Sequence, residues 1–274
     1  MKSVQARALA EARRPFATPR LGFYIAEAGR AVTGSSLAPR GSRNSISRAI
    51  AEIVDLAEQI IDERNKVEPP RGAIHCRPGC SHCCYMRVHV TPPEVILLAD
   101  FVKANFAVDQ FEGLVRRLTE NASTLRGVTD EEHGRAGIPC PLLVDDFCSA
   151  YVARPLECRG YASTDVTACK RALNDYDSWN VPIYRPQYSI FKYMQMGLVE
   201  ALMDSDYEFE LLELTAALRI ALEVPDVADR WLAGEFVFAD AALSHSDPEV
   251  DAANPWTNTF DVPNSCIDDA RAST

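Results

Sequence analysis

The sequence has no apolar run long enough to cross a membrane. Its longest candidates, EVILLADFV and IFKYMQMGLVEALM, are short and are interrupted by polar residues. The N-terminus is basic, but LGFYIAEAG is a poor apolar core for a secretory signal because it contains a glutamate. We therefore expect no membrane span and a cytoplasmic location, where thiols stay reduced.

Several enzyme signatures are also missing. No Ser/His/Asp set, phosphate-binding loop or Rossmann glycine fingerprint is visible, so hydrolase and nucleotide-dependent functions have no support. Strand-like alternation is scarce, with YMRVHVT as the best candidate, and nothing repeats at a fixed period. What the 274 residues do contain is 47% hydrophobic residues, enough for a globular core, and nine cysteines.

Charge is distributed unevenly. Residues 1–44 carry eight basic and two acidic side chains, a net +6, so the remainder carries −17 of the total of −11. An acidic body argues against nucleic-acid binding, because phosphate contacts need a cationic surface. TGSSLAPRGSRNS has the composition of a linker, so we interpret residues 1–44 as a loosely ordered basic extension. From residue 236 the chain turns to Asp, Asn, Ser and Pro, which predicts a weakly structured acidic tail over 236–274.

Between these ends, residues 45–235 show helical periodicity. SISRAIAEIVDLAEQIIDERNKV places its isoleucines and leucine on one helical face, and EPPRG ends that helix. Thr91 and Glu94 form a capping box with prolines between them, which predicts a helix over 92–106, followed by another over 109–123. An antiparallel pair of these helices would return the chain to the side it left. The segments DVTACKRALNDY, QYSIFKYMQMGLVEALM and FELLELTAALRIALEV also predict helices, so we expect a mainly α fold, an irregular helical domain organised around a cysteine-rich knot.

The cysteines are the most informative feature. They comprise a knot of Cys76, Cys80, Cys83 and Cys84, a spread-out set of Cys140, Cys148, Cys158 and Cys169, and Cys266 alone in the tail. Thiolates are soft ligands suited to zinc, cuprous copper and iron–sulfur clusters. A single buried cysteine is usually just a small apolar residue, and we prefer this interpretation for Cys266 and in part for Cys169. Four cysteines within nine residues favour a metal site, with the first eight as candidate ligands.

Because Cys83 and Cys84 are adjacent in the sequence, the way in which they can bind metal is constrained. Neighbouring side chains tend to point apart, so Cys83 and Cys84 either face two different metals, or one ligates while the other packs or reacts. Eight cysteines fit two four-thiolate sites or one multinuclear cluster. His75, His82 and His89 are substitutes for thiolates in principle, but we expect them to be loop or surface residues.

The residues resemble a known family. The knot is followed by CPLLVDDFCSAYVARPLECRGY, and this combination resembles the YkgJ-like cysteine-cluster proteins, described as a zinc- or iron-chelating domain. That family has a C-x-x-C-x-x-C-C-like knot and a downstream CPLL…C…Y…RP…CR.Y block; here the first spacing is three residues, and the match covers roughly residues 76–170. The resemblance implies metal binding and no agreed reaction. A flagellin lysine methylase carries a related pattern, which leaves a methyltransferase open by analogy only.

Two arginines stand close to a cysteine of the second block. Arg154 and Arg159 flank it in RPLECRGY, so we expect them to offset thiolate charge by hydrogen bonds to sulfur and to tune a redox potential. The alternative is a surface ion pair with Asp145, Asp146 or Glu157.

The knot spacing C-x3-C-x2-C is also that of radical S-adenosylmethionine enzymes. Those enzymes place the motif after the first strand of a partial (β/α) barrel. Here helices follow helices, and a fourth cysteine abuts the third, so we reject this interpretation.

Three function classes remain: an iron–sulfur protein for electron transfer or cluster-dependent modification, a zinc- or iron-chelating protein with a structural or stored metal, and an enzyme acting on protein side chains, such as a lysine methylase. Eight candidate thiols exceed one zinc site, so we prefer an iron–sulfur cluster over zinc or iron ions. We expect a protein partner or protein substrate.

Overall fold

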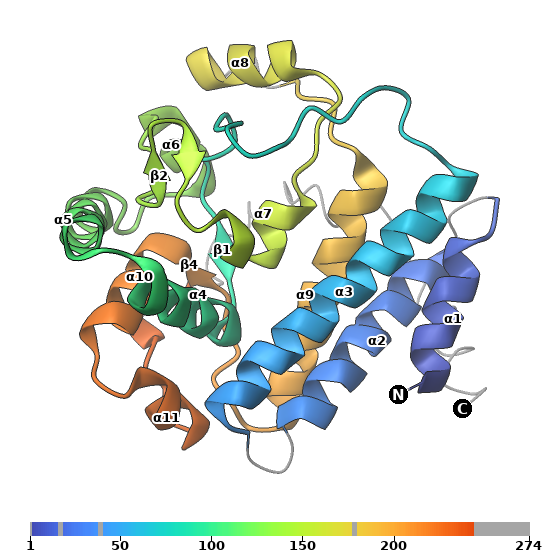
Figure 1. Cartoon of the computed structure of the whole chain (residues 1–274), viewed down its shortest axis with the longest axis horizontal. Coiled ribbons are helices and arrows are strands. Elements are labelled where there is room, and N and C mark those ends of the chain that lie inside the picture. The colour runs from blue at the N-terminus through green and yellow to red at the C-terminus, as the bar shows by residue number, and fades with distance from the viewer. Residues whose placement is uncertain (1, 16–18, 38–40, 177–179, 244–274) are drawn as a thin grey trace.

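The computed structural model describes residues 2–15, 19–37, 41–176 and 180–243, and it is mainly α-helical, as predicted (Figure 1). The helices are α1 (Lys2–Ala12), α2 (Pro19–Leu37), α3 (Arg43–Val67), α4 (Pro92–Asn105), α5 (Val108–Thr124), α6 (Asp130–Ala136), α7 (Leu156–Gly160), α8 (Val166–Asn174), α9 (Arg185–Asp204), α10 (Leu214–Glu223) and α11 (Val227–Leu232). The short strands are β1 (His89–Val90), β2 (Leu143–Val144), β3 (Phe147–Cys148) and β4 (Leu212–Glu213), and the 3-10 turns are η1 (Tyr151–Ala153) and η3 (Ala239–Ala241). No helix in these described ranges is both long and apolar enough to cross a membrane.

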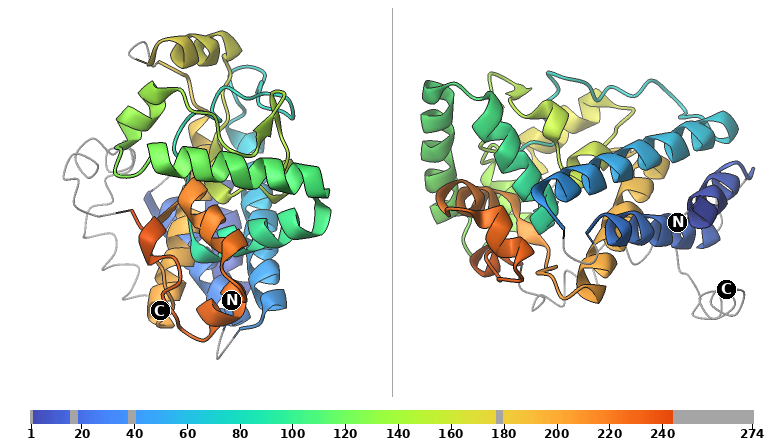
Figure 2. Two further views of the ribbon diagram at one scale, coloured as in Figure 1. Left: turned by 90° about the vertical axis from the view of Figure 1, so that its left-hand side faces the viewer. Right: turned by 60° about the horizontal axis from the view of Figure 1, so that its bottom comes forward.

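Helices α1, α2, α3 and α9 pack side by side (Figures 1 and 2). The closest approach is between α2 and α9, and two glycines permit it. A Cβ on Gly197 would lie 2.0 Å from the carbonyl oxygen of Ala26, and one on Gly29 would lie 2.8 Å from that of Met194. Since both neighbours are backbone atoms, only glycine fits at these positions.

The N-terminal helices belong to the core, which corrects the expectation of a loosely ordered extension over residues 1–44. Ala12, Ile25 and Val32 are at most 1% exposed. Arg64 of α3 donates a hydrogen bond to the carbonyl oxygen of Ala12 at 3.4 Å, at the end of α1. The physical reason is that LGFYIAEAGRAV places apolar residues on one helical face, which packs against α9, while its Arg30 pairs with Asp204 at the end of α9 at 2.6 Å.

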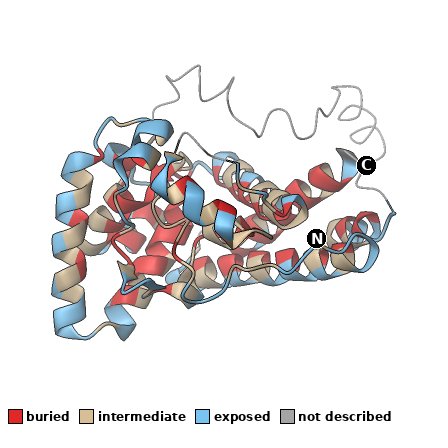
Figure 3. Cartoon of the chain, turned by 90° about the horizontal axis from the view of Figure 1, so that it is seen from above, coloured by how far each residue is buried: buried red, intermediate tan, exposed pale blue. Residues whose placement is uncertain are grey.

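A second group of helices consists of α4, α5, α10 and α11. Helix α4 begins at Pro92, as the capping box predicted. Helix α10 packs against both α4 and α5. Strand β1 pairs antiparallel with β4, with His89 opposite Glu213, and so joins the segment before α4 to the segment before α10. Figure 3 shows the buried residues between the helices and the exposed residues on their outer faces.

Glu94 is a buried carboxylate that links three helices. It is 3% exposed. Its Oε2 accepts hydrogen bonds from the backbone N–H and hydroxyl of Thr91, at 2.9 and 2.8 Å, and from Nε2 of Gln195 at 3.2 Å. Its Oε1 accepts from the backbone N–H of Leu156 at 2.7 Å. The side chain therefore holds the first turns of α4 and α7 and the middle of α9 together.

The first residues of the predicted weakly structured tail, 236–243, include buried side chains that pack on the core. Phe238 is fully buried, and its backbone N–H and that of Val237 donate to the carboxylate of Glu208, at 2.8 and 3.0 Å. The apolar pair Val237 and Phe238, together with Ala241 of η3, explains why this part packs on the core. Residues 244–274, including Cys266, lie outside the described residues.

The close α2–α9 contact makes a specific stability prediction. Gly197→Ala should lower the free energy of unfolding by about 1–3 kcal/mol, because its methyl group would overlap a backbone carbonyl that cannot move freely. Gly34→Ala is the matched control in α2: nothing lies within 4 Å of its Cβ position, so the higher helix propensity of alanine should leave stability unchanged or raise it by about 1 kcal/mol. Urea denaturation of both variants measures the difference; equal effects would contradict the packing described.

Candidate metal centre

The cysteine-bearing segments gather at one end of the molecule (Figures 1 and 2). After α3 ends, residues 68–88 run without regular secondary structure beside α8, the β2–β3 hairpin and α7. The proline pair in EPPRG prevents α3 from continuing into this segment. The cysteines are thus carried by loops and short elements, supported from below by the longer helices.

Two successive turns shape the knot. The backbone N–H of Cys80 donates to the carbonyl of Arg77 at 3.0 Å, and that of Cys84 donates to the carbonyl of Ser81 at 2.9 Å. Gly79 has φ +88°, a conformation that glycine adopts without steric cost. The turns fold the segment back on itself, so that its cysteines lie close together in space.

The second cysteine block folds against the knot. Its hairpin β2–β3 turns at Asp145 and Asp146, with φ 49° and 64°, which is the backbone conformation of a tight two-residue hairpin turn. The hydroxyl of Ser81 donates to Oδ1 of Asp146 at 2.8 Å. The backbone N–H of Cys140 donates to the carbonyl of Cys84 at 2.7 Å. Cys140 therefore lies beside the knot, although more than fifty residues separate the two along the chain.

One pocket has cysteines from both parts of the sequence in its wall. It is lined by Cys76, Cys80, Cys83 and Cys169, together with His82, Tyr161, Ala162, Ser163, Val181 and Ile183. Ser163 is 3% exposed, its backbone N–H donates to Sγ of Cys76 at 3.2 Å, and its hydroxyl hydrogen-bonds the thiol of Cys169. Ser163 thus holds cysteines from two distant segments. The sequence contains no signal for this role, because a single serine belongs to no spacing pattern.

The remaining distal cysteines pack between this pocket and the helical core. Cys140, Cys148 and Cys158 contact the hydrophobic core. Burial raises the pKa of Cys140 to about 12, and it raises the pKa of Cys158 well above its usual range. The neighbouring thiolates, including Cys83, add to both increases. Thiolates become favourable here only if a cation compensates their charge, which is what a bound metal provides.

Cys83 and Cys84 do not point apart as expected. Their thiols hydrogen-bond each other, and this bond, together with burial, raises the pKa of Cys83 well above its usual range. The tight turn at this point brings adjacent side chains together, which an extended backbone would not.

The cysteine side chains line a pocket but do not converge on one common point. Among the residues that the structure describes, no three His, Cys, Asp or Glu side chains converge closely enough to hold a single ion. The donor set nevertheless fits a metal group by its chemistry, since it consists of soft thiols in a partly buried wall.

Arg154 and Arg159 do not make the bonds to sulfur that we expected. Within the described chain, Arg154 donates to the carbonyl of Tyr151 at 3.0 Å and lies over its ring at 3.6 Å, while Arg159 donates to the carbonyls of Arg154 and Val152 at 2.9 and 2.6 Å. The alternative ion pairs are not formed either; Arg159 instead approaches Glu58 at 4.0 Å. The charge of Arg154 still favours the thiolate forms of Cys83 and Cys148.

The three candidate histidines, His75, His82 and His89, differ in their surroundings. His75 donates its backbone N–H to Ser163 at 3.0 Å. Burial and the charge of Lys170 lower the pKa of His82, and its buried Nδ1 has no hydrogen-bond partner among the described residues. His82 therefore adds an uncharged nitrogen donor to the wall of the cysteine pocket. His89 is not the loop or surface residue we expected, because it lies between Asp130 and Glu157, with nitrogen–oxygen distances of 3.3 and 3.4 Å.

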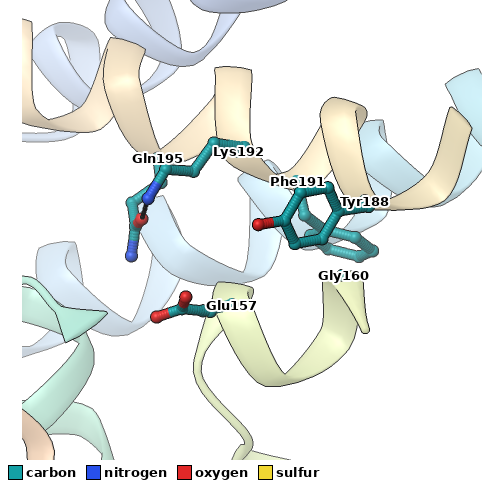
Figure 4. A pocket seen from close by; sticks show the side chains of 6 residues that line it. All are labelled: Glu157, Gly160, Tyr188, Phe191, Lys192 and Gln195. Carbon is teal, nitrogen blue, oxygen red and sulfur yellow. Dashed lines mark hydrogen bonds between the residues drawn. The ribbon is translucent and has the colours of Figure 1, made fainter. Parts of the chain in front are cut away.

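A smaller polar pocket lies between α7 and α9, where the carboxylate of Glu157 faces Lys192 and Gln195 (Figure 4). Tyr188 also lines this pocket, and its ring lies 5.4 Å from that of Tyr161, which lines the cysteine pocket. A pair of tyrosines therefore separates the two pockets. The first residue of the Glu157–Cys158 pair contributes to the polar pocket and the second to the cysteine cluster.

The fold and site define a helical, cysteine-rich protein with a candidate metal centre held by two separated blocks. Residues 75–178 match the family described as "CxxCxxCC: Putative zinc- or iron-chelating domain". This confirms the resemblance inferred from the sequence over that part of the chain, and it supports metal binding there. No curated protein and no solved structure matches the chain.

His89 makes stability depend on pH. Burial lowers the pKa of His89, but Glu157 and Asp130 outweigh it and raise the pKa to about 9. A histidine with a raised folded-state pKa contributes stability that is complete below its unfolded value of about 6.5 and lost as the pH rises through 9. The free energy of unfolding should therefore fall between pH 6.5 and 9, by something on the order of 2–3 kcal/mol.

Chemical denaturation across this pH range tests the prediction, with His89→Gln as the comparison. The variant should be less stable than the parent at pH 6 and should lose the part of the slope that the parent shows above pH 6.5. An unchanged slope in His89→Gln would mean that the ion pairs with Asp130 and Glu157 do not control it.

Proposed function

We propose that the chain binds an iron–sulfur cluster through its clustered cysteines and serves in redox chemistry or in cluster-dependent modification. The match of residues 75–178 to a zinc- or iron-chelating domain supports a metal at this place. The observation that favours a cluster over a single ion is that four cysteines line one pocket and four more lie in the segments packed beside it, which is more thiols than one zinc ion takes.

A structural zinc takes four ligands at about 2.3 Å from sulfur, which places the sulfurs within about 4 Å of one another. In an iron–sulfur cluster each thiolate binds a different iron, so the sulfurs surround the cluster at larger separations. The four cysteines around one pocket supply the number of thiolates that such a cluster binds.

The surrounding residues suit such a group. Ala162, Val181 and Ile183 form an apolar part of the pocket wall and limit the access of water. Ser163 donates to two of the cysteines, and the charge of Arg154 offsets part of the thiolate charge. When bound, an iron–sulfur cluster supplies one-electron transfer at a potential that these contacts adjust.

A cytoplasmic location and a protein partner are parts of the same proposal. An iron–sulfur centre needs reduced thiols, which is consistent with a cytoplasmic protein. Phe147 and Val152 are 58% and 71% exposed, and the ring of Phe147 lies beside Gly79 of the knot, which supports a protein partner or protein substrate at this end. With a net charge of −11, nucleic acid is not the expected partner.

Anaerobic purification tests the proposal. The protein should be brown, with broad thiolate-to-iron absorption, and should contain iron together with acid-labile sulfide. Cys80→Ala should lose much of this absorption, because Cys80 lines the pocket. Cys266→Ala should keep it. A colourless protein that holds stoichiometric zinc under the same conditions would replace the cluster by a chelated or structural ion. Aerobic preparations do not distinguish the two, since thiols that have lost a cluster scavenge zinc.

A further inference from the structure

Helix α8 is joined to the rest of the molecule by a narrow neck. The neck consists of two short segments, 162–164 and 182–184, which pair antiparallel where the chain leaves the core and returns to it. The backbone N–H of Tyr184 donates to the carbonyl of Ala162 at 2.7 Å. Residues 165–176 lie beyond this neck and form an arm that carries α8. Figure 1 shows α8 apart from the longer helices.

The neck itself is firmly attached to the knot. The backbone N–H of Ser163 donates to Sγ of Cys76 at 3.2 Å, and its carbonyl accepts a hydrogen bond from the backbone N–H of His75 at 3.0 Å. The hydroxyl of Ser163 donates to the carbonyl of Pro182 at 3.1 Å, across the neck. Because these bonds fix both strands of the neck, the arm has a rigid base about which it can move.

The arm beyond the neck is packed only lightly. The buried residues of α8 are Ala168 and Ala172, which are 3% and 2% exposed. The hydrophobic core of the described chain includes no side chain of α8. Alanine removes little apolar surface from water, so this packing stabilises the arm weakly. Segments with few buried apolar contacts open locally at a lower free-energy cost than the core.

An aromatic ring at the end of the arm rests on α6. A Cβ on Gly134 would lie 2.1 Å from the ring of Tyr176, so the ring lies against the backbone of α6 at a position where only glycine fits. The guanidinium of Arg135 lies 5.5 Å from the centre of the same ring. Helix α6 is held in turn by Asp130, which accepts a hydrogen bond from Arg87 at 2.9 Å. Tyr176 therefore closes the arm against an anchored helix.

The arm contributes to the wall of the cysteine pocket. Cys169 of α8 lines this pocket together with Cys76, Cys80 and Cys83 of the knot. Three of these cysteines stand on the knot, to which the neck is bonded, and the fourth stands on the arm. Movement of the arm away from α6 would therefore carry one part of the wall with it and would widen the pocket.

We propose that the arm opens about its neck as a unit, and that this opening admits metal ions to the cysteine pocket. The anchored neck, the light packing of α8 and the closure by a single ring together allow the arm to move without disturbing the core. The same route would serve zinc, iron or the components of a cluster, so it goes beyond the proposed function without depending on which group is bound.

Hydrogen exchange of the full chain, read by mass spectrometry, tests whether the arm moves as a unit. In the parent, the amides of residues 166–174 should exchange together and faster than those of α3 and α9, because opening the arm breaks few contacts. Tyr176→Ala removes the ring and Gly134→Ala displaces it, so each should accelerate exchange of the arm by about fivefold or more. Phe236→Ala removes an exposed ring outside the arm and should match the parent.

Two results of this experiment would overturn the proposal. One is that the arm of the parent is protected as strongly as α3, which would make it part of the core; this comparison needs no variant to fold. The other is that Tyr176→Ala and Gly134→Ala accelerate exchange equally throughout the chain, which would mean that the ring stabilises the whole fold.

Alkylation by iodoacetamide tests whether the arm controls access. In the full chain, freed of metal by a chelator and kept anaerobic, labelling of Cys76 and Cys80 should accelerate in Tyr176→Ala by a factor similar to that seen in exchange. Both cysteines stand on the knot, so their labelling reports on the pocket and not on the arm itself. Unchanged labelling beside accelerated exchange would show that the arm does not close the pocket and would overturn the proposal. Neither measurement requires a bound metal, so each outcome is independent of the proposed cluster.

Discussion

The arrangement of this protein depends on one buried carboxylate. A charge on Glu94 is costly in the core, and burial raises the pKa of that carboxyl. The structure compensates with four donors, from Thr91, Leu156 and Gln195. Because these donors lie on three helices, satisfying a single side chain fixes how α4, α7 and α9 meet. The helix that carries Cys158 is positioned by this contact, so the cysteine cluster inherits its geometry from a polar group outside it.

A second, partly buried charge network begins at Glu157, the residue that follows Leu156. Glu157 accepts a hydrogen bond from the backbone N–H of His89 and also faces its imidazole, while Asp130 faces the other side of the ring and Arg87 at 2.9 Å. These groups join β1, α6 and α7. Together with Glu94 they give the loops at the cysteine-bearing end a rigid base, which loops need if they are to present ligands in fixed positions.

Much of the helical framework follows from the sequence, because periodicity reports which face of a helix is buried. This worked for α3, α4, α9 and α10. It did not identify α2 as a core helix, because the basic composition of residues 1–44 obscures an apolar face that packs against α9. Ser163 could not be predicted, since its role comes from tertiary contacts. Cys169 lines the pocket. The sequence interpretation places it partly in the core, because no local pattern links it to the knot. The ligand roles of the cysteines remain a prediction.

The irregular course of residues 68–88 has a consequence for biosynthesis. The knot has no secondary structure of its own, and its contacts are with Asp146, Cys140 and Ser163, all of which are made by the ribosome much later. Domains begin to form from the N-terminal side during synthesis, so α1, α2 and α3 can associate early, but the knot stays without its supports until α8 has emerged. Assembly of any cofactor is therefore a late event that follows translation of most of the chain, and in the interval the exposed thiols depend on the reducing capacity of their surroundings.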